Sequence, residues 1–294
     1  MKQVSLLALL LISTQAFADD THVLRPSEPS SRTLDVTEEQ TVKNERKKTD
    51  AGVAPRGGSK TLELRNEHLS LVIQFVQELG AEKKLRRQYQ QCTSTKSSDS
   101  SKQKKVEAPA VKELLPRGAS FSEGTMSPGG GVTFPKLVAK TRRLRSPWRS
   151  FLCRSDALIA VLLPAKALKP KQTWTVDPKL LNPLLPSWRR TADVKGKVQG
   201  TLESVKREGG CRVARVTVSI RLEADQDRLP KHKSFRGLNR LEGKAEVLVD
   251  LDSHVVLSLE IETKSEVLRD VWDSGRKVST TTFALVRRAV LKKK

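Results

Sequence analysis

Side chains able to bind a metal ion gather at Asp250, Asp252 and His254. Residues two apart on a strand share one face, so these three could point toward one ion. The same segment is also typical of a tight hairpin turn, because Asp and Ser favour such turns. An EF-hand calcium loop that began at Asp250 would need Glu where Ile261 stands. We therefore predict a turn here and no metal site or cofactor.

Residues with catalytic potential elsewhere do not form a recognisable active site. His22, His68 and His232 stand in no motif that pairs them with a nucleophile, and the G-x-S-x-G, H-E-x-x-H and G-x-G-x-x-G patterns are absent from the sequence. Acidic residues of the last segments alternate with aliphatic ones, which places them on a solvated face; they are Glu246, Asp250, Glu260, Glu262 and Glu266. We predict that the protein is not an enzyme, with a hydrolase of unrecognised site as an alternative.

Positive charge is the strongest compositional signal. The 294 residues include 55 Lys and Arg against 33 Asp and Glu, a net charge of +22. One stretch has no acidic residue and is the candidate anion-binding site; its basic residues are Lys136, Lys140, Arg142, Arg143, Arg145, Arg149 and Arg154. Such a stripe suits an anionic envelope polymer or lipid head groups. Nucleic acid is a poor candidate, since only 4% of residues are aromatic and no helix-turn-helix pattern is present.

The N-terminal segment predicts export. Residues 1–18 combine Lys2, an apolar run from Val4 to Ile12 and the Ala16-Phe17-Ala18 cleavage pattern of a signal peptide. The mature chain would then begin near Asp19 and lie in the periplasm or outside the cell. No later stretch approaches the roughly 18 apolar residues of a transmembrane helix.

Export permits disulfide bonds, but the cysteines are only Cys92, Cys153 and Cys211. An odd number at wide spacings allows at most one internal disulfide. Cys153 with Cys211 is the preferred pair, because both lie in the region predicted to fold.

Composition divides the chain into three parts. Residues 19–60 are polar without a 2- or 3.6-residue period and predict a disordered leader. Residues 61–294 predict a single β-rich domain, with a disordered loop at 92–105. Within it, residues 69–91 fit both a helical and a strand period, and a hairpin around Gly80 is slightly favoured.

The fold follows from the second half of the chain. Short helices are expected at 155–163, where a Pro follows, and at 178–185, with a strand at 171–176 between them. Five strands then alternate apolar and polar residues, at 194–203, 211–223, 241–251, 257–263 and 278–286. A phase change at Val213 indicates a bulge near Ala214 and Arg215. We predict an α+β fold: mainly an antiparallel β-sheet, a meander able to curve into a half-barrel, with a few short helices.

Several short patterns resemble a known group of proteins. A Trp174 strand after Leu162-Leu163-Pro164, a Gly-Gly-Cys-x-Val strand from Gly209, and a Leu-x-Gly-x-Ala-x-Val strand from Leu241 resemble uncharacterised exported bacterial envelope proteins. The resemblance covers residues 155–265. It implies a curved antiparallel sheet similar to lipoprotein-carrier half-barrels and carries over no site residue.

Together these observations predict an exported, non-catalytic protein that binds a partner or an apolar ligand in the cell envelope. A basic protein that binds polyanions or anionic membrane surfaces is the alternative.

Overall fold

The computed structural model describes residues 20–24, 32–49, 61–80, 84–100, 110–115, 120–126, 132–139, 152, 154–184, 194–227, 236–271 and 275–291. The predicted signal peptide at 1–18, and residues 140–151 of the predicted basic stripe, lie outside these ranges.

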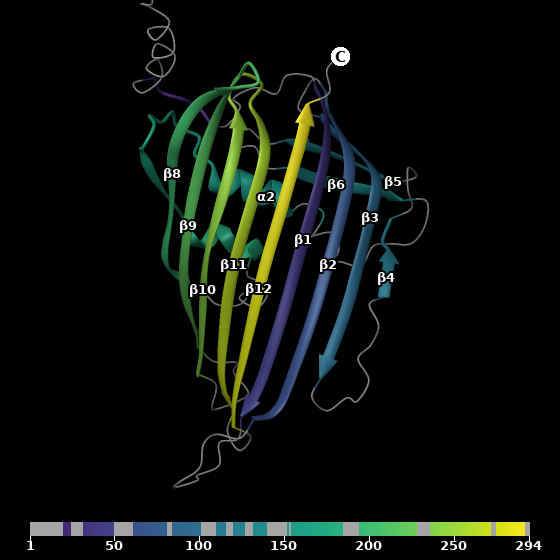
Figure 1. Ribbon diagram of the computed structural model, residues 1–294, viewed down its shortest axis with the longest axis vertical. Helices are drawn as coiled ribbons and strands as arrows, with labels where there is room; N and C mark the ends of the chain where they lie inside the picture. Colours follow the sequence, from purple (N-terminus) through teal and green to yellow (C-terminus); the bar gives the residue numbers. More distant parts are fainter. Residues whose placement is uncertain are drawn as a thin grey trace, which may run out of the picture.

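Most described residues belong to one 12-stranded antiparallel sheet (Figure 1). Its strands are β1 (Arg32–Thr49), β2 (Thr61–Leu79), β3 (Lys84–Ser100), β4 (Ala110–Glu113), β5 (Ser120–Met126), β6 (Val132–Ala139), β7 (Thr173–Val176), β8 (Val194–Glu208), β9 (Cys211–Asp227), β10 (Arg236–Asp250), β11 (Val255–Val271) and β12 (Gly275–Leu291). The strand order is β6-β5-β3-β2-β1-β12-β11-β10-β9-β8-β7, and β4 pairs with β3. The sheet is therefore two meanders joined by the pairing of β1 with β12.

The helix α2 (Arg154–Leu162) packs on one face of this sheet, which we call the inner face. Side chains alternate between the two faces, so in β1 Leu34 and Val36 are buried while Asp35 and Thr37 are exposed. A 3-10 helix, η2 (Pro178–Leu184), lies beside α2 and β8. The inner face therefore carries the core, and the outer face is more exposed.

The core has two apolar clusters. The larger joins Leu158 and Leu162 of α2, Trp174 of β7 and the inner faces of β8 to β12. The smaller lies on β1, β2 and β3 and includes Val36, Phe75 and Tyr89. Along β1 and β12 the two clusters are separated by the buried polar pair Glu38 and Arg287.

The structure confirms the predicted fold class. The five C-terminal strands form a meander with turns at 209–210 and 251–254, and the helices predicted at 155–163 and 178–185 are α2 and η2. Residues 69–79 and 84–91 are strands that pair with each other, and the backbone N–H of Gly80 donates to Lys84 O at 2.8 Å.

The bulge is in a different strand from the one predicted. The register of β8 against β9 shifts between Leu202 and Ser204, whereas β9 pairs with β10 without a shift. The extra residue of the bulge is thus in β8, the partner of β9. Val213 and Ala214 are both buried near the start of β9.

The prediction of a disordered leader at 19–60 is wrong for residues 32–49, which form the central strand β1. It is also wrong at His22, whose backbone pairs with Leu168, and at Leu24, which is buried in the larger cluster. The period in β1 is hidden because Glu38 and Gln40 occupy inner-face positions.

The predicted loop at 92–105 is likewise wrong for its first part, since β3 continues to Ser100. Small polar side chains hide this strand from a hydrophobicity pattern. Ser94, for example, points to the inner face and is buried.

Candidate functional site

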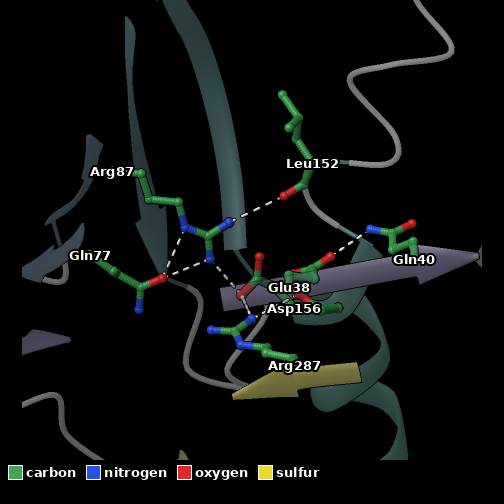
Figure 2. Close-up of polar contacts among 8 residues, drawn as sticks. Glu38, Gln40, Gln77, Arg87, Leu152, Asp156 and Arg287 are labelled. Carbon is green, nitrogen blue, oxygen red and sulfur yellow. Dashed lines mark hydrogen bonds and ion pairs between the residues drawn. The ribbon is translucent and has the colours of Figure 1, made fainter. Parts of the chain in front are cut away.

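A buried charged network joins the start of α2 to the sheet (Figure 2). We define it as Glu38 of β1, Arg87 of β3, Ser155 and Asp156 of α2, and Arg287 of β12. Each of these residues exposes 5% of its surface or less. Burying charge in a protein interior is costly unless the charges are paired.

Asp156 is the centre of the network. Its Oδ1 accepts hydrogen bonds from Arg87 Nη2 at 2.6 Å and from Arg287 Nη1 at 2.7 Å. Burial alone would raise the pKa of this carboxyl, but the two guanidinium groups outweigh burial and hold the pKa below its usual value. Asp156 is therefore a buried carboxylate that forms ion pairs with two arginines at once.

The guanidinium group of Arg87 has several further contacts. Its Nε and Nη2 donate to Gln77 Oε1 at 2.9 and 2.7 Å, and its Nη1 donates to Leu152 O at 3.3 Å. The guanidinium also lies 4.3 Å from the centre of the Phe75 ring. The group is thus fixed in one orientation toward the helix.

Glu38 occupies a different electrostatic environment. Its carboxylate accepts a hydrogen bond from Ser155 Oγ at 2.6 Å and another from Gln40 Nε2. Burial raises the pKa of Glu38, although Arg287 and the bond from Ser155 oppose that rise. Ser155 Oγ in turn accepts from Arg287 Nη1 at 2.8 Å, which connects the two carboxyls.

Two carboxyls with oppositely shifted pKa values are typical of acid–base chemistry as well as of structural ion pairs. Here the groups are enclosed between the helix and four strands, and Ser155 is 0% exposed. A substrate has no contact with them in this arrangement. The network is therefore suited to fastening α2 across the junction of β1 and β12.

Sequence reasoning did not identify this network. Glu38 falls in the predicted leader, and Arg87 falls in the segment 69–91, which fits both a helical and a strand period. The available signal was a polar pair, Glu38 and Gln40, at positions two apart, which becomes informative only once the strand register is known.

Of the predicted anion-binding stripe, Arg154 is placed by the structure in the core. It is 7% exposed, its guanidinium lies 5.0 Å from the centre of the Phe283 ring, and burial lowers its pKa to about 10. The prediction of an accessible anion-binding side chain is wrong at Arg154. Lys136 is a residue of β6. The other five residues of the stripe lie outside the described residues; they are Lys140, Arg142, Arg143, Arg145 and Arg149.

The segment from Asp250 to His254 forms the turn between β10 and β11. Asp250 Oδ1 accepts from the backbone N–H of Asp252 at 2.9 Å, and Asp252 Oδ1 accepts from Arg212 Nε at 2.7 Å. Ligand atoms of Asp250, Asp252 and Cys211 lie within 4.8 Å of one another. Because Asp250 is bonded within the turn and Asp252 is bonded to Arg212 of β9, the geometry is explained without a metal ion.

Cys211 carries a free thiol in the structure, so the preferred disulfide with Cys153 is not formed. Cys92 is also a free thiol and is buried on the inner face of β3. Cys153 itself lies outside the described residues.

A second feature is the distal strip, a part of the inner face that lies beyond the two carboxyls toward the C-terminal end of β1. We define it as Val42 and Asn44 of β1, Leu69 of β2 and Thr281 of β12, all only partly buried. Val42 is paired with Leu69 on one side and with Phe283 on the other. Thr281 Oγ1 and Asn44 Oδ1 are 2.6 Å apart and hydrogen bonded. Apolar and polar side chains therefore share a half-exposed surface.

No family model and no curated protein matches this sequence. Among solved structures, one similar chain is lipovitellin, in a structure that concerns its lipid–protein interactions. Sequence identity is 10% and the TM-score 0.42, over 91% of this chain and 26% of lipovitellin. The chain thus spans about a quarter of that protein. An outer membrane channel from Pseudomonas putida F1 has 8% identity and a TM-score of 0.24, over 90% of this chain and 97% of the channel. At these scores neither likeness bears on function.

The described helices include none that is long and apolar enough to span a membrane.

Proposed function

We propose that this chain is an exported, non-catalytic binding protein of the cell envelope, and that the distal strip binds the apolar chain of a ligand. The observation that carries the proposal is the presence of half-buried Val42 and Leu69 side by side on the inner face of the sheet. Covering apolar surface of this kind with a ligand lowers the free energy, because the surface is removed from water.

The lengths of the elements explain why this surface is left uncovered by α2. The helix has 9 residues, which is about 14 Å at 1.5 Å per residue. The central strands β1 and β12 have 18 and 17 residues, or about 55 to 60 Å at 3.3 Å per residue. The strands accordingly extend well beyond the helix, as Figure 1 shows at their lower ends.

The absence of catalysis is supported by how the reactive groups are used. Ser155, Glu38 and Asp156 are bonded to one another or to arginines inside the core. Asp250 accepts hydrogen bonds within the turn between β10 and β11, and Asp252 bonds that turn to Arg212 of β9. Export is supported by the signal-peptide pattern of residues 1–18.

Binding of an apolar fluorescent probe to the chain that begins at Asp19 tests the proposal. We expect N-phenyl-1-naphthylamine to bind with saturation and to be displaced by single-chain lipids. The double variant Val42→Gln/Leu69→Gln should weaken probe binding by about tenfold, since it removes most of the apolar surface of the strip.

The matched control changes two apolar residues to Gln on the outer face of β2 and β12, the strands that flank β1, as Val72→Gln/Val286→Gln. Both control residues are partly buried, so the two variants change a sheet surface of the same kind. Equal loss of binding in both variants, or no saturable binding to the parent chain, would contradict the proposal. Retention on heparin at 0.15 M salt without probe binding would favour the polyanion alternative instead.

A further inference from the structure

Two arginines lie directly opposite each other beyond the distal strip. Arg46 of β1 pairs in register with Arg65 of β2, and both belong to the inner-face set by their alternation with Asn44 and Glu67. Like charges opposite each other in an antiparallel pair destabilise a sheet. Another interaction must therefore offset the free-energy cost of this pair.

Both guanidinium groups reach the same carboxylate. Arg65 Nη2 lies 3.0 Å from Glu67 Oε1, and Arg46 Nη2 lies 3.7 Å from Glu67 Oε2. The arginine side chains are 56% and 47% exposed for Arg46 and Arg65, whereas that of Glu67 is only 18% exposed. One carboxylate thus offsets two cations, which leaves one positive charge and several N–H donors facing solvent.

The inner face changes character step by step away from α2. Val42 and Leu69 come first, Asn44 and Thr281 follow one step along, and Arg46 with Arg65 follow one step further. Each step of two residues is about 7 Å. Lys96 of β3, which is exposed, stands opposite Leu69 on the same face and adds positive charge beside the strip.

We propose that the ligand of the distal strip is a single anionic amphiphile. Its carboxylate or phosphate head binds Arg46 and Arg65, and its apolar chain lies along Val42 and Leu69. Guanidinium groups match both head groups, because their planar N–H donors can bind two oxygens at once. This inference rests on the proposed function and adds the charge and position of the head group.

Three ligands of equal chain length test it: dodecanoate, dodecyl phosphate and dodecanol, each below its micelle concentration and each measured by displacement of N-phenyl-1-naphthylamine. We expect the two anions to bind about tenfold more tightly than the alcohol at low salt, and the difference to shrink at high salt. In the variant Arg46→Gln/Arg65→Gln, the affinity for the two anions should fall to the affinity for the alcohol. The affinity for the alcohol itself should change by less than about twofold.

The control variant is Arg240→Gln/Arg288→Gln on the outer face. Arg240 and Arg288 are similarly exposed and similarly paired with glutamates, at 3.1 and 3.5 Å, so this variant removes the same net charge. Its anion preference should be that of the parent chain.

Glu67→Gln provides an opposite change. Removing the carboxylate that competes for both arginines should tighten anion binding by about threefold, which a merely structural role of Arg46 and Arg65 does not predict. Equal binding of anions and alcohol by the parent chain would overturn the inference and leave the proposed function standing. Failure of all three ligands and of the probe would overturn the proposed function itself.

Discussion

Replacing Asp156 by Asn should destabilise the protein far more than replacing Glu38 by Gln, although both carboxyls are buried in the same network. Asp156→Asn keeps the shape of the side chain but leaves two buried guanidinium groups without their shared counter-ion. Breaking a buried ion pair in this way costs about 3–5 kcal/mol.

Glu38→Gln should cost less than about 1 kcal/mol at pH 7. The amide oxygen of Gln still accepts the hydrogen bond from Ser155 Oγ, and the change removes a carboxyl whose pKa burial has raised. The pH dependence has a definite sign. A raised pKa means that the folded state holds the proton longer, so this carboxyl lowers stability progressively as pH rises from about 4.5 through its folded pKa.

The measurement is urea denaturation of both variants and the parent chain between pH 3 and pH 8. Glu38→Gln should gain stability relative to the parent as pH rises above 4.5. Because the pKa of Asp156 is lowered, its contribution should be complete above about pH 3.8 and disappear as pH falls through its folded pKa. Similar losses in the two variants, or a silent Asp156→Asn, would refute the assignment of the central role to Asp156.

Three further predictions concern single positions. Gly200→Ala should displace the Trp174 ring and change its fluorescence, because a Cβ on Gly200 would lie 2.2 Å from the ring carbons; the loss of stability should be about 2 kcal/mol or more. Cys92 should resist a disulfide reagent at pH 8 until the protein is unfolded, since burial raises its pKa to about 12, whereas the partly exposed Cys211 should react in the folded protein. Asp250→Ala should destabilise the protein by about 1–2 kcal/mol in urea denaturation, because the carboxylate accepts from two backbone N–H groups of its turn; an unchanged midpoint would show that the turn does not depend on it.

The part of the fold that could be predicted is the part in which polar and apolar residues alternate without interruption. Val216, Val218 and Ile220 face the core in turn, and the structure places them as the pattern predicts. In β1 the inner face is Leu34, Val36, Glu38 and Gln40, so the pattern breaks where the network begins. A hydrophobicity pattern misses a strand in which inner-face positions are occupied by the polar residues of a buried site.

The charged network was beyond sequence reasoning for a related reason. Arg87 and Asp156 are 69 residues apart, and Asp156 and Arg287 are 131 residues apart. Their proximity depends on the pairing of β1 with β12, which no local pattern specifies. The distal strip is similar, because Val42 and Leu69 become neighbours only through the register of β1 and β2.

The pairing of β1 with β12 also sets an order of assembly. Leu34 pairs with Leu291, so the middle of the sheet joins segments from nearly opposite ends of the described chain. Each meander can form from local hairpins, but the junction between them involves a large loss of chain entropy and forms slowly. During synthesis from the N-terminus, one edge of β1 therefore stays unpaired until β12 has been synthesised. An unpaired strand edge is a site of aggregation, so this chain is most open to aggregation in the interval before β12 is made.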